Sequence, residues 1–165
     1  MARPKHQTEP GGTYFLTTNT WERRAMFRKA DWADIVERKI FEYREKGEYL
    51  LHRHVVMPDH LHVILTPGCS TSVERAAQLI KGGSSYDLGR AFRARFPVWQ
   101  PGFTQHLIRD RADYESHVHY VDGNPVQEGL AGRPEEYQFC SAHGKYRLDP
   151  WPVASGAKAP LGAAG

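Results

Sequence analysis

Two apolar segments joined by a short turn place the strongest constraint on how this chain can fold. Residues 49–57 and 60–66 are rich in β-branched and other apolar side chains, and Pro58-Asp59 between them is a turn signal. Strands this close along the chain pair antiparallel, because a parallel pair needs a crossover of about a dozen residues or more. The sequence therefore predicts a β-hairpin at the centre of the chain.

The segments on either side of the hairpin predict further strands and helices. Residues 13–20 alternate in polarity, which indicates a strand, and apolar residues from Trp32 to Tyr43 recur at helical spacing. Three more elements are predicted: a helix over 72–81 that is interrupted or ends at Gly82-Gly83, an extended segment over 98–108, and a helix over about 112–122. The order β-α-β-β-α-β-α indicates one α+β domain, with a central antiparallel sheet flanked by helices.

Composition limits the class of protein. The 165 residues are 40% hydrophobic and 25% charged, which is ordinary for a globular domain, and no apolar run is long enough to span a membrane. Cys69 and Cys140 are too few for a disulfide framework. We therefore expect one cytoplasmic domain over residues 11–150, with a flexible N-terminus over 1–10 and a flexible C-terminal tail over 151–165.

Basic side chains are concentrated in parts of the chain, although the net charge is only +3. Arginine outnumbers lysine by 15 to 7, and the planar guanidinium suits phosphate recognition. Residues 75–111 carry seven basic and two acidic side chains, whereas residues 113–149 carry three and seven. This segregation is expected of a protein with one face toward a polyanion. A solvated helix face explains either segment alone.

Two His-x-His segments lie in the predicted hairpin. Residues i and i+2 of a strand point to the same face, so His60 and His62 would offer two nitrogen ligands to one divalent metal ion. His52 and His54 have the same spacing on the preceding strand. Spacing alone does not choose between the two pairs.

A tyrosine and an asparagine share one face of the last predicted helix, because Tyr120 and Asn124 are spaced i, i+4. A phenol with a pKa of about 10 is a poor nucleophile without help, and a metal ion helps by polarising a phosphodiester. The amide oxygen of Asn124 would complete a site with two histidines. A half-buried core tyrosine, followed by a helix C-cap before Pro125, explains the same pattern, and local pattern alone favours that explanation.

Four blocks follow one another along the chain. They are GGTYFLT at 11–17, VVMPDHLHVIL at 55–65, WQPGF at 99–103 with His106, Ile108 and Arg109, and Asp113-Tyr114, His117-Val118 and YVDGNPV at 120–126 with Gly129-Leu130. In order and at similar spacing, these blocks resemble the HUH single-tyrosine transposases, and within them the REP-associated tyrosine transposases, whose strand–turn–strand motif the block at 55–65 resembles. The likeness covers about residues 11–147.

The resemblance implies the HUH fold, which is ferredoxin- or RRM-like, and a set of site residues. It makes Tyr120 the nucleophile and His60, His62 and Asn124 the metal ligands. His52 and His54 fall outside the motif, and His54 stands where the family usually has an apolar or aromatic residue, so we expect it to be peripheral. Gly123 departs from the family pattern and loosens the last helical turn by roughly 1 kcal/mol.

The activity implied by the resemblance is that of a metal-dependent single-stranded DNA transposase. It would cleave and rejoin DNA beside palindromic, REP-like hairpins through a 5′-phosphotyrosine intermediate, with Mg²⁺ or Mn²⁺ as cofactor, as a monomer or a homodimer. The residues expected to contact DNA are Arg23, Arg24, Arg75, Lys81, Arg90, Arg93, Arg95, Arg109, Arg111 and His106, the last of which could equally serve packing. Such phosphate contacts make binding strongly salt-dependent.

Two alternatives remain open from the sequence. The chain could be a domesticated protein that holds DNA hairpins without cutting them. It could also be a metal-dependent hydrolase of small phosphoesters, with water as the nucleophile. The presence of Tyr120 together with His60 and His62 favours activity over the binding protein, and a covalent, protease-sensitive protein–DNA adduct would exclude the hydrolase.

Overall fold

The computed structural model describes residues 8–152, which include a four-stranded antiparallel sheet. Its strands are β1 (Tyr14–Asn19), β2 (Tyr49–Met57), β3 (His60–Pro67) and β4 (Thr104–Leu107), in the order β2-β3-β1-β4. The predicted hairpin is confirmed, because β2 and β3 pair antiparallel with Met57 opposite His60. β3 lies between β2 and β1, so both of its edges are paired.

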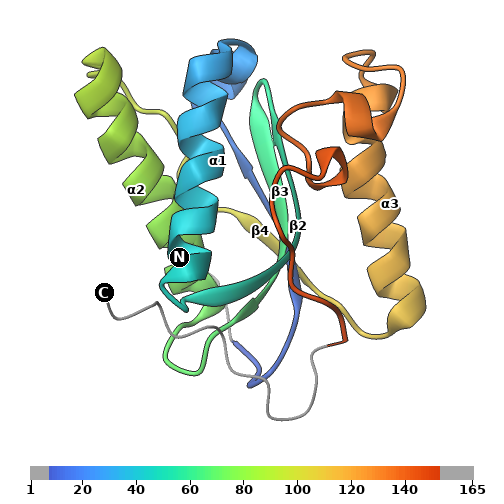
Figure 1. Cartoon of the computed structure of the whole chain (residues 1–165). Helices are drawn as coiled ribbons and strands as arrows, with labels where there is room; N and C mark the ends of the chain where they lie inside the picture. The colour runs from blue at the N-terminus through green and yellow to red at the C-terminus, as the bar shows by residue number, and fades with distance from the viewer. Residues whose placement is uncertain (1–7, 153–165) are drawn as a thin grey trace.

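Helices cover both faces of this sheet (Figure 1). α1 (Ala30–Glu45) and α2 (Val73–Phe92) pack side by side on one face, and α3 (Arg111–Gln127) lies on the other. Among the described residues, no helix is long and apolar enough to cross a membrane. Short 3-10 turns occur at η1 (Trp21–Arg23), η2 (Met26–Arg28), η3 (Pro134–Glu136) and η4 (Ser141–His143). The predicted α+β class is confirmed, and the β-α-β-β-α-β order with this strand sequence is the ferredoxin-like arrangement.

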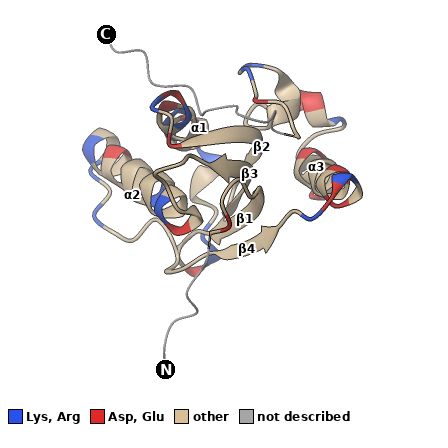
Figure 2. Ribbon diagram, turned by 90° about the horizontal axis from the view of Figure 1, so that it is seen from below, with Lys and Arg blue, Asp and Glu red and all other residues tan. Residues whose placement is uncertain are grey.

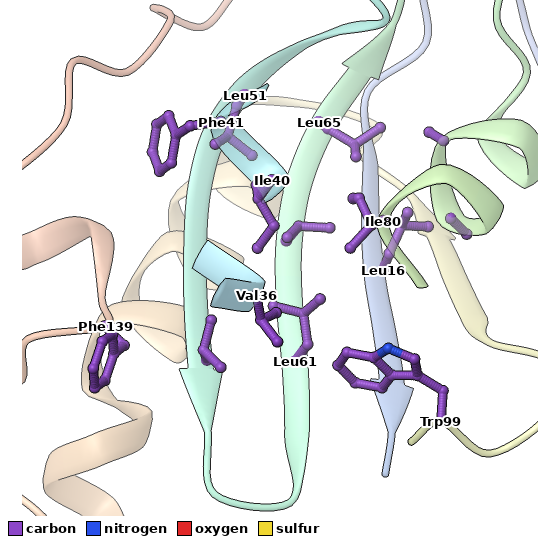
Figure 3. Packing of buried hydrophobic residues seen from close by; sticks show 14 of the residues in the cluster. Leu16, Val36, Ile40, Phe41, Leu51, Leu61, Leu65, Ile80, Trp99 and Phe139 are labelled. Atoms are coloured by element: carbon purple, nitrogen blue, oxygen red, sulfur yellow. The ribbon is translucent and has the colours of Figure 1, made fainter. Parts of the chain in front are cut away.

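Alternation along β3 separates the two faces of the sheet. Leu61 and Val63 belong to the main core between the sheet and the α1–α2 layer (Figure 3). Ile64 belongs instead to a smaller apolar cluster beneath α3. Because successive strand residues point to opposite faces, His60 and His62 share the α3 face with Ile64. Each fully buried apolar side chain of the core contributes about 1.5–3 kcal/mol, which fixes this register.

The predicted end of a helix at Gly82-Gly83 is wrong. α2 continues through both glycines to Phe92. A Cβ added at Gly83 would lie 2.6 Å from the Tyr43 hydroxyl and 2.9 Å from Cδ of Lys39, both on α1. Glycine at this position therefore lets two helices approach closely and does not end the helix.

The last helix is longer than its sequence pattern indicates. α3 begins after Asp110, as expected, but continues past residue 122 to Gln127 and contains Pro125 in its last turn. The end of the helix keeps a backbone bond across the proline, since the Glu128 N–H donates to the Asn124 carbonyl at 3.1 Å. Asn124 is thus part of the helix and is not a cap.

Most of the two ends predicted to be flexible, residues 1–10 and 151–165, lies outside the described residues. Trp151 is described, and its ring stacks on that of Tyr114 of α3 with 4.3 Å between centroids. The predicted extended segment over 98–108 forms β4 and one isolated bridge between Thr20 and Trp99.

Candidate active site

Two histidines of the central strand lie next to each other beneath α3. His60 and His62 are 5% and 4% exposed, and their ring centroids are 4.7 Å apart. Both belong to β3, which is paired without a register shift to β1 across this stretch. The strand geometry that the sequence predicted for this pair is therefore what the structure has.

A polar neighbour holds each imidazole by its Nδ1 atom. Nδ1 of His60 lies 2.7 Å from Oδ1 of Asp59, and Nδ1 of His62 lies 2.7 Å from the Thr17 hydroxyl. A carboxylate beside Nδ1 keeps the proton there and leaves a lone pair on the other ring nitrogen. On His60 this leaves Nε2 toward Asn124, and on His62 Nε2 has no hydrogen-bond partner, so Nε2 is the nitrogen that each ring can offer to a ligand.

The helix α3 brings an amide and a phenol to these rings. Asn124 is 4% exposed, and its Oδ1 lies 3.0 Å from Nε2 of His60. One turn earlier, the Tyr120 ring contacts the His62 ring edge-on, with 5.2 Å between centroids. Tyr120 is 47% exposed, so a substrate as large as a DNA strand can reach it from solvent.

Burial keeps the His62 imidazole in the neutral state that binds metals. Burial, the neighbouring His60 and the charge of Arg23 together lower the pKa of His62 to about 3. His62 is therefore neutral at neutral pH, and its buried Nε2 has no hydrogen-bond partner. A buried nitrogen without a partner costs free energy unless a ligand occupies it.

The donor set fits a small divalent cation. Nε2 of His60 lies 3.0 Å from Oδ1 of Asn124, and the tautomer with its proton on Nδ1, toward Asp59, offers lone pairs on both atoms. Neighbouring ligands of an octahedral ion with bonds of about 2.1 Å are about 3 Å apart, so a shared cation would satisfy both atoms. Two imidazole nitrogens and one amide oxygen form a mixed nitrogen–oxygen donor set without a thiolate.

The second His-x-His segment is used differently. Both nitrogens of His52 are occupied, by the Asp149 carbonyl and by the Thr66 hydroxyl, each at 2.9 Å. His54 is buried, with Nε2 2.8 Å from Oε2 of Glu37 on α1, so it packs on the face of the sheet opposite α3 and lies outside the candidate site, as expected. These residues are not brought together with Tyr120, and the geometry favours His60 and His62 as the candidate pair.

A third histidine cluster, which the sequence reasoning missed, anchors the start of α3 to β4. His106 Nε2 lies 2.8 Å from Oδ2 of Asp113, and His117 Nδ1 lies 3.2 Å from Oδ1 of the same carboxylate. Burial raises the pKa of Asp113, but hydrogen bonds from the Arg109 N–H and from His106 lower it to about 2. The i, i+4 spacing of Asp113 and His117 is the signal that would have found this cluster.

This cluster is joined by hydrogen bonds and by stacking. Its three ligand-type atoms lie within 4.8 Å of one another, close enough to hold a metal ion. However, Nδ1 of His117 also donates to the Asp113 carbonyl at 2.8 Å, and the His106 and His117 rings stack with 4.7 Å between centroids. The Phe15 ring lies against both His117 and Tyr120, so the cluster braces the turn of α3 that precedes the tyrosine.

The basic residues predicted to contact DNA do not gather on one face. Figure 2 shows basic segments both on α2 and at the start of α3, on opposite sides of the sheet. Three of these residues have close partners within the protein: Lys81 donates to the Gln100 and Gly102 carbonyls at 2.8 and 2.6 Å, Arg23 pairs with Asp59, and His106 pairs with Asp113. The other seven are exposed arginines, some of which form surface ion pairs: Arg24, Arg75, Arg90, Arg93, Arg95, Arg109 and Arg111.

Comparison with known proteins supports one family. The family model described as "Transposase IS200 like" matches residues 11–124, a span that includes Tyr120 and all three proposed ligands. The REP-associated tyrosine transposase of Escherichia coli (strain K12) is 28% identical over 145 residues, covering 84% of each chain. A solved structure of a REP-associated tyrosine transposase bound to a REP hairpin superposes with a TM-score of 0.73 at 26% identity, over 96% of each chain. The resemblance inferred from the four sequence blocks is confirmed.

Proposed function

Since the chain belongs to the IS200-like transposase family and resembles its REP-associated members, we propose that it cleaves and rejoins single-stranded DNA beside palindromic hairpins. In this proposal Tyr120 is the nucleophile, and His60, His62 and Asn124 hold the metal ion. The strongest support is the 5.2 Å contact between the Tyr120 and His62 rings, one helical turn from the contact of Asn124 with His60.

The metal site would take Mg²⁺ or Mn²⁺, which when bound polarises the phosphodiester and stabilises charge on its oxygens. The protein's own part is to keep the ligand atoms in place. Asp59 and Thr17 hold the two imidazoles through Nδ1, and burial keeps His62 neutral. Phe15 lies against His62, with 5.2 Å between ring centroids, and limits how far that ring can turn.

Tyr120 would carry out a transesterification. Its oxygen attacks phosphorus and forms the new P–O bond while the bond to the 3′ oxygen breaks. The phenol gives up its proton, and the departing 3′ oxygen takes one up, so the step is balanced without an oxidant or ATP. The phosphodiester is conserved as a 5′-phosphotyrosine link, and attack by a second 3′-OH reverses the step and joins a new strand.

The proposed partner is single-stranded DNA that folds into a REP-like hairpin. The support is the solved relative, which is bound to a REP hairpin. Exposed arginines on α2 and at the start of α3 would provide two sets of phosphate contacts, one on each side of the sheet. His106 is less suited to direct contact because Asp113 occupies its Nε2. The working form as a monomer or homodimer, and the cytoplasmic location, stay predictions.

The proposal is tested with a hairpin-bearing single strand labelled at its 3′ end, incubated with purified protein and Mn²⁺. The label should become covalently attached to the protein, stay attached in denaturing gels and be released by protease. Tyr120→Phe should form no adduct while binding the same hairpin with unchanged affinity in EDTA. An adduct formed by Tyr120→Phe would show that the nucleophile is another residue.

The same experiment separates the two alternatives. A domesticated hairpin-binding protein would retain the strand without any cleavage. A metal-dependent hydrolase would release two fragments without an adduct at any time point. Either result contradicts the proposed strand transfer.

A further inference from the structure

A strained turn after β1 directs one arginine back toward the proposed metal site. Glu22 and Arg23 have positive φ angles of 53° and 55°, a left-handed conformation that is uncommon for residues other than glycine. Hydrogen bonds that hold this turn include those from the Trp21 N–H to the Val98 carbonyl, from the Glu22 N–H to the Gln100 side chain and from the Arg23 N–H to the Thr20 carbonyl. Figure 1 shows this segment at the same end of the sheet as the β2–β3 turn.

The Arg23 guanidinium reaches the residue that precedes His60. Its Nε and one terminal nitrogen each lie 3.2 Å from Oδ2 of Asp59, and its other terminal nitrogen donates to Oδ1 of Asn19 at 2.7 Å. The other oxygen of Asp59, Oδ1, is the one that lies 2.7 Å from Nδ1 of His60. Each carboxylate oxygen therefore has its own partner.

The backbone of this turn is also tied to β1. The Thr20 N–H and the Thr20 hydroxyl both donate to the Asp59 carbonyl at 3.0 Å. The Asp59 backbone is thus held by one residue and its side chain by another, so the carboxylate is fixed at both ends. Without Arg23, only the His60 contact would restrain the Asp59 side chain, which is partly exposed.

We propose that Arg23 is a positioning residue, which acts through Asp59 to orient His60 as a metal ligand, and not a phosphate-binding residue. The inference rests on the proposed function, because it needs His60 to be a ligand. Partners of this kind fix the tautomer and orientation of a metal-binding imidazole, and losing one costs about 10–100-fold in metal affinity.

Arg24 is a matched control one residue away. Both arginine side chains are 55% exposed and follow the same strand, but Arg24 pairs with Glu22 at 3.1 Å and has no contact with Asp59. If only the positive charge near the site matters, substituting either arginine should change Mn²⁺ binding by the same amount. If Arg23 positions Asp59, only its substitution should weaken Mn²⁺ binding.

The test measures Mn²⁺ binding directly, from the paramagnetic resonance signal of free Mn²⁺, in protein without DNA. Arg23→Ala and Asp59→Asn should each raise the Mn²⁺ dissociation constant at least tenfold, and the double variant should be no worse than Asp59→Asn alone. Arg24→Ala should have the Mn²⁺ dissociation constant of the wild-type protein. Arg23→Lys keeps the positive charge but loses the planar guanidinium that contacts Asp59 and Asn19 together, so it should recover only part of the Mn²⁺ affinity.

Hairpin binding in EDTA gives the second reading. Arg23→Ala should keep the affinity and salt dependence of the unchanged protein. The inference is overturned in favour of a phosphate contact if Arg23→Ala keeps the wild-type Mn²⁺ dissociation constant but binds the hairpin more weakly. In that case the slope of log affinity against log salt concentration should also fall by about one. If the wild-type protein binds no Mn²⁺, or if His60→Ala binds Mn²⁺ as tightly as the wild-type protein does, the proposed metal site itself is wrong. If His60→Ala loses Mn²⁺ and Arg23→Ala does not, only the positioning role is wrong.

Discussion

The two His-x-His segments of the central hairpin have the same spacing but lie in different surroundings. A register shift between Leu51 and Arg53 interrupts the pairing of β2 with β3. His52 consequently lies against Tyr114 of α3, whereas His54 lies against Phe41 of α1, on the opposite face of the sheet. One irregular residue thus separates a pair that a regular strand would have kept together.

The two histidines of β3 differ from those of β2 in how their strand is hydrogen-bonded and in what their ring nitrogens contact. His60 and His62 lie on a strand that is paired regularly with β1, so they keep a common face. Nε2 of His62 has no partner and Nε2 of His60 contacts Asn124, which is itself a proposed ligand, whereas His52 has its two nitrogens on the Asp149 carbonyl and the Thr66 hydroxyl. Spacing selects candidates for a metal site, and continuous strand pairing with ligand-type neighbours favours the pair on β3.

The largest difference predicted between the two His-x-His segments is in catalysis. His60→Ala should reduce adduct formation with hairpin DNA by about a thousandfold or more, because the metal ion supplies several kcal/mol of transition-state stabilisation. His52→Ala should keep the rate, per folded molecule, within about threefold. Single-turnover rates, corrected for the folded fraction by circular dichroism, give both values. Equal losses from the two substitutions would contradict the assignment of the metal site.

The second prediction concerns stability, where a histidine of β2 should matter more than a histidine of β3. His54→Leu should lower the free energy of unfolding by about 2–3 kcal/mol, since it leaves the buried Glu37 carboxylate without one of its partners. His62→Leu should lower the stability of metal-free protein by only about 1 kcal/mol, because it loses the Thr17 contact at Nδ1 while its Nε2 has no partner to lose. Urea unfolding in EDTA measures both. A greater loss from His62→Leu would reverse the roles given to the two segments.

The smallest effect concerns the third pair, His106 and His117, which share the Asp113 carboxylate. The pKa of Asp113 is about 2 in the folded protein against an ordinary 3.8. A lowered carboxyl pKa adds stability that is complete above about pH 4 and is lost as the pH falls toward 2. Asp113→Asn should therefore be less stable by on the order of 1 kcal/mol at pH 6 and should lose less stability on acidification. Urea midpoints that fall in parallel for both proteins between pH 4 and pH 2 would show that Asp113 does not contribute.

The sequence predicted the order of elements well, for physical reasons that lie in single segments. The hairpin follows from two apolar runs around Pro58-Asp59, and the pairing of Tyr120 with Asn124 follows from helical periodicity. The proposed site also depends on the family resemblance, because spacing alone left His52 and His54 as equal candidates.

What the sequence could not predict depends on contacts between distant segments. The register shift at Leu51 is a property of strand pairing and leaves no mark in local composition. The sequence around Gly83 predicts that the helix is interrupted or ends there, because nothing in its own segment shows that Tyr43 of α1 would lie 2.6 Å from a Cβ at that position. The pairing of Arg23 with Asp59 joins two turns far apart in the chain, so the sequence alone predicts that Arg23 contacts DNA.

The central claim, that Tyr120 acts beside His60 and His62, is tested most directly by locating the covalent bond to DNA. After reaction with hairpin-bearing DNA and Mn²⁺ and trimming by nuclease, mass spectrometry should find the 5′-phosphate of the residual nucleotide on Tyr120. Attachment at another residue, such as the neighbouring Tyr114, or cleavage without any attached nucleotide, would contradict the account.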